Sequence, residues 1–236
     1  MSGKLFIIPI PISNTDFNKV ITPYTVDIAK SLRLFVVEKI KTSRQFLRQI
    51  DSKFPIDEST FFELNKHKNY EFNTEVIELL KSGKDVGIMS EAGYPGIADP
   101  GSAVVKLAHQ NNIEVIPLIG PSSLFLALAA SGLNGQGFTF NGYLPKDERQ
   151  RMESIKRLSV TISNTGFAQL FIETPYRNQA IFTSLLKHAS PDLELTIAID
   201  ITGEKEKIKT LKIKNWPKAK LIFEKAPCVF ILGQFS

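Results

Sequence analysis

The residues between Val86 and Gly101 have the types and spacing of a ligand-binding loop. A short apolar run suits a buried strand, and the turn after it contains three glycines, two prolines and two carboxylates. In open α/β sheets, ligands bind beyond the carboxyl ends of the strands, where glycines let a ligand approach the backbone. The loop has neither the Walker lysine pattern nor the G-x-G-x-x-G spacing, so we expect a different kind of ligand.

Two later turns also carry reactive groups. The first, Gly120 to Ser123, places two hydroxyls and free backbone donors at a predicted helix start, and capping by Ser122 or Ser123 is the structural alternative. The second, Phe171 to Arg177, joins an acid, a proline and an arginine after an apolar run, and a structural ion pair between Glu173 and Arg177 is its alternative.

The elements that must position these turns alternate along the chain. We predict strands at residues 5–12, 34–38, 86–90 and 113–118, separated by helical patterns that include 75–82 and 102–111, and this alternation predicts a mostly parallel sheet. Residues 122–130 form a helix with almost no polar face, which we expect to be buried on most sides.

Beyond that helix the pattern indicates a second domain. We predict strands at 138–144, 168–174, 193–201, 208–213 and 226–235 and helices near 148–158 and 176–187, with antiparallel pairing among the last three strands. The chain is thus predicted to form two α/β domains, residues 1–118 and 119–236, with the loop at 90–101 and the turn at 120–123 facing their junction, where ligand sites are common.

Composition narrows the class of protein. The chain has 236 residues, 43% hydrophobic and 22% charged, which is typical of a globular protein. No run approaches the roughly 20 apolar residues of a membrane helix, and we expect neither a signal peptide nor a membrane role. A single cysteine, Cys228, excludes an intramolecular disulfide and a cysteine-based zinc site, so we expect a cytoplasmic protein without a metal.

Basic residues are unevenly spread. The net charge is +5 and the isoelectric point about 9.2, which permits a polyanionic partner. One predicted helix carries Arg149, Arg151, Lys156 and Arg157, for which phosphate binding and a solvated face are equally favoured. A lysine run from Lys205 to Lys214 is better explained as a solvated face.

Taken in order, five segments resemble one family, the tetrapyrrole methylases that use S-adenosylmethionine. They are Pro9 to Asn14, Ser90 to Gly101, Ile119 to Ser122, Gly142 to Pro145 and Phe171 to Arg177. More narrowly, they are similar to the branch that methylates the ribose 2'-hydroxyl of a cytidine in 16S ribosomal RNA. The resemblance spans nearly the whole chain.

The resemblance implies a two-lobed α/β fold, with a mostly parallel N-terminal sheet, a mixed C-terminal sheet and a cleft for S-adenosylmethionine between them. It also implies a homodimer and an RNA substrate. Carried over by position, the cofactor-binding residues would be Pro9, Pro11, Met89, Ser90, Glu91, Ala92, Gly93, Ala98, Asp99, Pro121, Ser122 and Ser123. For Glu91 and Asp99, turn capping is the alternative to cofactor binding.

The segments expected to contact the substrate match the motifs of the ribosomal branch less well than the cofactor segments do. The branch has Glu-Asp-Thr-Arg where Glu38 is followed here by Lys39, Ile40 and Lys41, and its histidine before Arg177 is Tyr176 here. A base would help to remove the proton of a ribose hydroxyl, and Glu38, Glu173 and His67 are candidates. We expect substrate contacts from Asn14, His67, Arg149, Arg151 and Arg177.

Three hypotheses therefore stand. The first is a methyltransferase that acts on structured RNA, for which the arginine helix and the positive charge provide phosphate contacts. In the second, the acceptor is a small molecule such as a tetrapyrrole. In the third, the chain is a binding module that keeps the cofactor and has lost methyl transfer.

Overall fold

The first half of the chain forms a parallel five-stranded sheet. In the computed structural model, which describes residues 2–64, 69–219, 221, 223 and 225–235, the strand order is β3-β2-β4-β1-β5 and every pairing in this sheet is parallel. The strands are β1 (Leu5–Ile7), β2 (Leu34–Val37), β3 (Thr60–Glu63), β4 (Val86–Met89) and β5 (Val115–Pro117). The predicted α/β class is confirmed.

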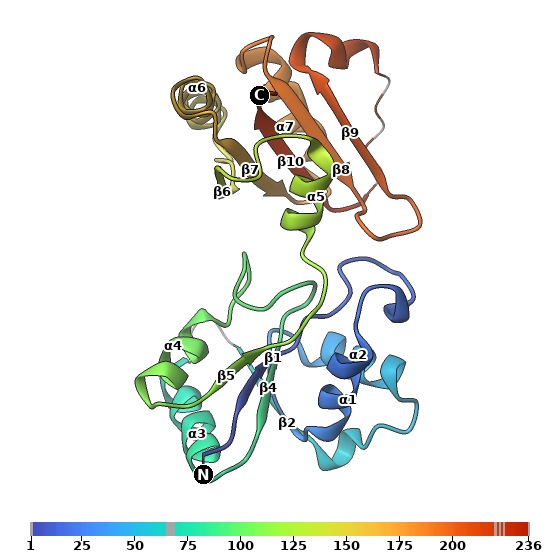
Figure 1. Cartoon of the computed structure of the whole chain (residues 1–236), viewed down its shortest axis with the longest axis vertical. Helices are drawn as coiled ribbons and strands as arrows, with labels where there is room; N and C mark the ends of the chain where they lie inside the picture. Colours follow the sequence, from blue (N-terminus) through green and yellow to red (C-terminus); the bar gives the residue numbers. More distant parts are fainter. Residues whose placement is uncertain (1, 65–68, 220, 222, 224, 236) are drawn as a thin grey trace. The chain divides into compact units, whose positions relative to one another are not determined.

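Helices cover both faces of this sheet (Figure 1). The first face carries α1 (Pro23–Ser31) and α2 (Ile40–Ile50), together with the short 3-10 turns η1 (Phe17–Lys19) and η2 (Ile56–Glu58). The second face carries α3 (Asn69–Lys81) and α4 (Ser102–Gln110). Strands β1 and β4 are neighbours whose following helices lie on opposite faces, which is the arrangement that opens a crevice at the carboxyl end of a sheet.

The second half forms a mixed sheet with the order β6-β7-β10-β8-β9. Its elements are α5 (Ser123–Ser131), β6 (Phe138–Tyr143), α6 (Glu148–Thr165), β7 (Ala168–Glu173), α7 (Asn178–His188), β8 (Glu194–Ile199), β9 (Lys207–Lys212), η3 (Ile213–Lys218) and β10 (Cys228–Gly233). Strands β6 and β7 are parallel, and the other pairs are antiparallel. The antiparallel pairing expected for the last three strands is therefore confirmed.

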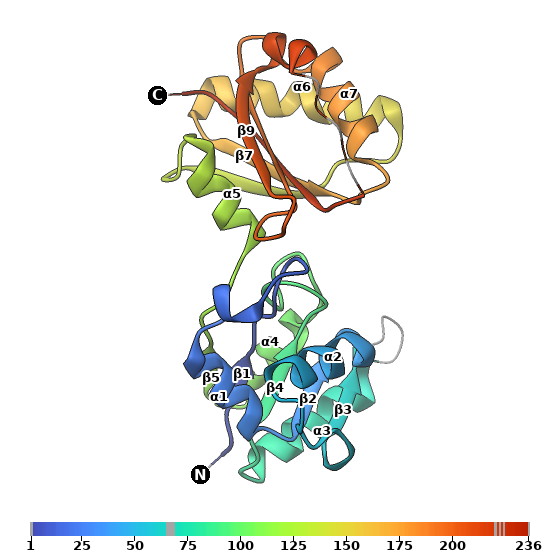
Figure 2. The same ribbon diagram turned by 90° about the vertical axis from the view of Figure 1, so that its right-hand side faces the viewer.

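Each half has its own core. Contacts divide the chain into two units, Met1–Ser122 and Ser123–Ser236. In the second unit, α6, α7 and η3 pack on one face of the sheet around the buried Trp216, whose indole nitrogen donates to the Leu195 carbonyl at 3.0 Å, and α5 covers the other face (Figure 2). Among the described residues, every helix is too short or too polar to cross a membrane.

Helix α5 corrects one prediction. Leu124, Ala127 and Leu128 are buried, but Phe125 is 53% exposed and Leu126 39% exposed, so the expectation of burial on most sides is wrong. The helix lies on a single sheet face, which can cover only the side turned towards it. Sequence reasoning also gave no bounds for α1, α2 and β3, although the buried Ser43, Phe46, Leu47 and Ile50 of α2 have helical spacing.

Candidate functional site

Three loops meet at the carboxyl edge of the first sheet. They follow β1, β4 and β5, which are adjacent in the order β4-β1-β5. Ile10 and Gly93 exchange two backbone hydrogen bonds, of 3.0 and 3.1 Å, and the Tyr94 hydroxyl donates to the carbonyl of Leu118. The predicted segments around Pro9, around Gly93 and before Pro121 are therefore brought together within the first unit.

Glycines permit this close approach. Gly93 has a φ of +66°, and a β-carbon there would lie 3.0 Å from the Ile12 side chain. A β-carbon on Gly120 would lie 2.3 Å from Cγ of Pro9, closer than two such atoms can come. The loops after β1 and β5 can pack this tightly only because residue 120 has no side chain.

Three carboxylates, those of Glu38, Glu91 and Asp99, lie close together at residues 90–101, the segment after β4 that we call the glycine loop. Oε2 of Glu38, at the end of β2, accepts a hydrogen bond of 3.0 Å from the backbone N–H of Glu91. The pKa of Asp99 is raised to about 6, first by burial, then by the negative charges of Glu38 and Glu91, while the nearby Ser90 side chain opposes the shift. Within the described residues, no three metal-ligating side chains are placed to hold a metal ion.

The remaining residues of the loop shape it. Met89 is fully buried, and its carbonyl accepts from the Glu38 backbone N–H at 3.1 Å. Ser90 is also buried, and its hydroxyl donates to the Ala92 carbonyl at 3.0 Å. Ala92 and Ala98 are exposed, and Ala98 has a φ of +66°, an unusual backbone conformation for an alanine.

Other predicted site residues are less constrained. Pro9 and Pro121 are buried, and Pro11, Ser122 and Ser123 are half-buried, with Ser123 beginning α5. Asn14 is exposed on the loop after β1. His67 lies outside the described residues.

In the second unit, Glu173 and Arg177 form the ion pair that was the structural alternative. Nη1 of Arg177 lies 3.1 Å from Oε2 of Glu173, whose side chain is 1% exposed. The other Glu173 oxygen accepts from the Thr174 backbone N–H at 2.8 Å, and Nη2 of Arg177 donates to the Leu144 and Pro145 carbonyls. A buried carboxylate that is already paired is poorly placed to accept a substrate proton.

The arginines of α6, the predicted arginine helix, also make structural contacts within the protein. Nε of Arg151 donates to the Ser184 hydroxyl at 2.9 Å, and its Nη1 donates to the Lys146 carbonyl at 2.8 Å. Arg149 is exposed and pairs with Glu153 one turn away at 3.3 Å. These contacts favour a structural role for Arg151, and the sequence held no signal for them because its partners lie on a different helix and in a loop.

Sequence reasoning missed the contacts that hold the loops in place. The Thr25 hydroxyl donates to the Ile119 carbonyl at 2.9 Å, and Nζ of Lys39 lies 3.1 Å from Oε1 of Glu91. A Thr-Pro pair at residues 22–23 marks the start of α1, but nothing in the sequence indicates that Thr25 reaches the loop after β5.

The residues at this edge fit S-adenosylmethionine. Ile97 and Ile119 are exposed apolar side chains on two of the three loops, suited to a neutral adenine ring. The three carboxylates favour a donor that carries a positive sulfonium. The cofactor would be held mainly by backbone groups of the loop that contains Gly93.

We predict that Gly120→Ala lowers the free energy of unfolding by about 1–3 kcal/mol, because the new methyl group overlaps the Pro9 ring. Urea-induced unfolding measures the change. Gly135→Ala is the matched control, since nothing lies within 4 Å of a β-carbon there, and its effect should stay within about 0.5 kcal/mol. Equal effects of the two substitutions would contradict the packing described here.

The raised pKa of Asp99 predicts that the stability of the protein depends on pH. Because its folded-state pKa, about 6, exceeds the ordinary aspartate value of 3.8, the folded state holds the proton more tightly, and this contribution to stability falls as the pH rises from about 4 to 6. Asp99→Asn should therefore raise the melting temperature at pH 7.5, with a gain that shrinks towards pH 4. Asp27→Asn, an exposed control on α1, should show no such trend. A gain independent of pH would contradict the raised pKa.

Comparisons with known proteins identify the family. The model of the tetrapyrrole (corrin/porphyrin) methylases matches residues 4–216. A protein of Buchnera aphidicola subsp. Schizaphis graminum named ribosomal RNA small subunit methyltransferase I is 31% identical over 239 residues, covering 100% of this chain and 80% of the relative. A protein of the same name from Thermotoga maritima is 34% identical over 205 residues, covering 85% of this chain and 84% of that one.

Solved structures share the fold at low sequence identity. The methyltransferase CobJ aligns over 99% of this chain and 95% of its own, with 17% identity and a TM-score of 0.64. Diphthine synthase aligns over 99% of this chain and 90% of its own, with 16% identity and a TM-score of 0.64. With the family match over most of its length, this chain belongs to the tetrapyrrole methylases and is a methyltransferase that uses S-adenosylmethionine.

Proposed function

We propose that this chain transfers a methyl group from S-adenosylmethionine to small-subunit ribosomal RNA, at the 2'-hydroxyl of a cytidine ribose. The observation that carries the proposal is the similarity of the chain, over 85–100% of its length, to relatives named ribosomal RNA small subunit methyltransferase I. The net charge of +5 is consistent with a polyanionic substrate. The relatives favour RNA over a tetrapyrrole as the acceptor.

The proposed cofactor site is the carboxyl edge of the first sheet. Its residues are Pro9, Pro11, Met89, Ser90, Glu91, Ala92, Gly93, Ala98, Asp99, Pro121, Ser122 and Ser123. Support comes from the hydrogen bonds that join the loops after β1, β4 and β5 and from the positive φ values of the glycine loop. Backbone amides in such a loop can bond an adenine without charged side chains.

S-adenosylmethionine supplies a sulfonium, whose neutral thioether is an excellent leaving group. The protein then has mainly to align the acceptor oxygen with the methyl group and to accept a proton. We assign the proton-accepting role to the Glu38 carboxylate, which is partly exposed and bonded to the glycine loop through Glu91. Glu173 is the weaker candidate, because its carboxylate is buried against Arg177.

Substrate contacts divide into two groups. Asn14 and Arg149 are exposed and remain proposed RNA ligands. Arg151 and Arg177 donate to backbone carbonyls, so we propose that they support the segment before α6 and contribute to RNA binding only indirectly. We place the enzyme in the cytoplasm, because a single cysteine cannot form an intramolecular disulfide, the bond that an oxidising compartment favours.

The first measurement is calorimetric titration with S-adenosylmethionine and S-adenosylhomocysteine. Micromolar binding should be lost in Gly93→Trp. The new side chain would collide with Ile12, and the φ of +66° at this position disfavours any residue other than glycine. Because that variant strains the backbone, Ala92→Trp provides a second test at an exposed loop position, and Ala180→Trp on α7 is the control. Failure of the wild-type protein to bind either ligand would overturn the cofactor site.

Transfer itself is tested with radiolabelled S-adenosylmethionine and small ribosomal subunits that lack methylation. Label should enter the RNA and, after nuclease digestion, be recovered on a cytidine ribose, with Glu38→Gln slowing transfer about 100-fold or more even at saturating S-adenosylmethionine. Label recovered only in a small-molecule fraction would favour a tetrapyrrole-like acceptor. Cofactor binding without any transfer would favour the binding module.

We further propose that the enzyme is a homodimer that uses the exposed side of α5. Phe125 and Leu126 are exposed there, and the Phe125 ring meets the partly exposed Phe138 edge-on, with centroids 6.0 Å apart. Leu126→Glu should convert a dimer into a monomer in analytical ultracentrifugation, because it places a charge in an apolar contact. Val160→Glu, an equally apolar exposed position on α6, is the control, and a monomeric wild-type protein would refute the dimer.

A further inference from the structure

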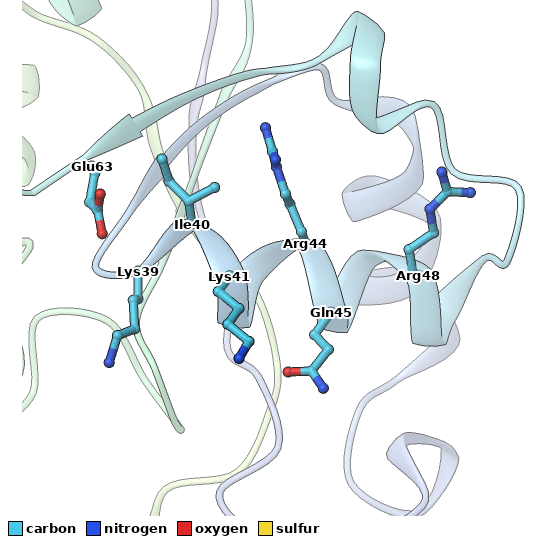
Figure 3. Close-up of a pocket in the computed structure, with 7 residues that line it drawn as sticks. All are labelled: Lys39, Ile40, Lys41, Arg44, Gln45, Arg48 and Glu63. Atoms are coloured by element: carbon cyan, nitrogen blue, oxygen red, sulfur yellow. The ribbon is translucent and has the colours of Figure 1, made fainter.

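Helix α2 carries a strongly basic surface outside the glycine loop. An open hollow of about 660 Å³ lies on this helix. Its lining consists of Lys39, which precedes the helix, of Ile40, Lys41, Arg44, Gln45 and Arg48 on the helix, and of Glu63 (Figure 3). The hollow is therefore lined by four cations and one carboxylate. We refer to these seven residues as the α2 basic face.

The helical repeat explains why three of the cations start from one side of the helix, although their side chains then turn in two directions (Figure 3). Residues three or four positions apart share a helix face, so Lys41, Arg44 and Arg48 fall together. The side towards the sheet is formed by Ser43, Phe46, Leu47 and Ile50, all of which are buried. The exposed side is thus free to bind a partner without any change in the core.

Parts of this surface are held in position. The Arg44 guanidinium lies over the Phe61 ring, 5.1 Å from its centroid, and Nη1 of Arg48 donates to the Ser52 carbonyl at 2.6 Å. In Figure 3, Arg44 and Arg48 extend towards the same side of the helix, and Lys41 and Gln45 extend towards the other. Within the described part of the chain, Lys41 makes no ion pair.

The α2 basic face adjoins the glycine loop within the first unit. Nζ of Lys39 lies 3.1 Å from Oε1 of Glu91, and the Thr42 hydroxyl donates to the same oxygen at 3.4 Å. Glu38, which immediately precedes Lys39, bonds the Glu91 backbone. A ligand on this face would therefore lie beside the proposed proton acceptor.

The other basic clusters are explained by structural contacts. On α6, Arg149 pairs with Glu153, and Arg151 donates to Ser184 and to loop carbonyls. Strand β9 is a sheet edge, where exposed lysines such as Lys207 and Lys209 commonly prevent edge-to-edge association. The α2 cations have fewer such contacts. Within the described residues, Arg48 donates to one carbonyl and Arg44 lies over one ring, whereas Arg151 donates to three acceptors.

We infer that the α2 basic face binds the sugar-phosphate backbone of the substrate RNA next to the ribose that is methylated. This inference rests on the proposed function and names the RNA-binding surface of the same site. Guanidinium groups bind phosphates bidentately, and lysines add point charges. Lys41 and Arg48 are separated by about 10 Å along the helix axis, which allows contacts to more than one phosphate.

The test compares two exposed pairs with identical chemistry. Lys41→Glu/Gln45→Glu changes the α2 basic face, and Lys106→Glu/Gln110→Glu makes the same substitutions at the same spacing on α4, which covers the opposite face of the sheet. A third variant, Arg44→Gln/Arg48→Gln, removes two cations without adding charge. Filter binding to unmodified 16S ribosomal RNA transcribed in vitro gives affinity as a function of salt, and calorimetry checks S-adenosylmethionine binding.

We expect the first variant to bind RNA about 10-fold or more weakly, and the third to lower the dependence of log affinity on log salt by about 1–2. Cofactor affinity should be unchanged in both, and the α4 control should bind RNA like the wild-type protein. Equal weakening by the α2 and α4 variants, or no weakening by either α2 variant, would overturn the inference.

Failure of the inference is distinct from failure of the proposed function. Methylation of RNA that is insensitive to the α2 substitutions would refute the surface and leave the function intact. RNA binding that depends on α2 without methyl transfer would support the surface and refute the function. If the wild-type protein binds neither this RNA nor small ribosomal subunits that lack methylation, both are refuted.

Discussion

The site depends on the parallel pairing of β1 between β4 and β5. Ile7 is in register with Ile88 on one side and with Pro117 on the other, so all three strands end at the same edge and their loops leave it together. Two hydrogen bonds between Ile10 and Gly93 then join the loops after β1 and β4 in an isolated antiparallel bridge. The contacts between these loops are therefore made largely by backbone atoms.

Two further hydrogen bonds involve the loop after β4. The Glu91 backbone N–H donates to Glu38, and the Tyr94 hydroxyl donates to the Leu118 carbonyl. Glycine is required where chains approach closely, as at Gly93 and Gly120, and these glycines are present. The geometry of the loops therefore depends on backbone hydrogen bonds and on these two glycines.

Charge is organised around the same edge. Glu38, Glu91 and Asp99 form an anionic group, and burial together with mutual repulsion raises the pKa of Asp99 to about 6. The cations of α2 lie next to it, joined through the pair between Lys39 and Glu91. Opposite charges are thus separated over a short distance, an arrangement suited to a positively charged donor on one side and a polyanion on the other.

The sequence by itself determined the α/β class, the strands that carry the reactive turns, and the family, because apolar periodicity and glycine spacing are local properties of the chain. It did not show which arginines donate to several groups of the protein itself, since an arginine with such partners and one without them are the same residue type. The tertiary structure made that distinction for Arg151 and Arg177, whose acceptors come from elements distant in sequence.

The tertiary structure also decided which elements share a surface. Helix α2 and strand β3, both missed in the sequence, create the hollow that gathers Arg44, Arg48 and Glu63. The exposed side of α5 was likewise decided by packing, since an apolar helix on one sheet face buries only the side that meets the sheet. Local sequence determines which elements form and where glycine is needed, whereas long-range packing determines which side chains are buried, paired or free to bind.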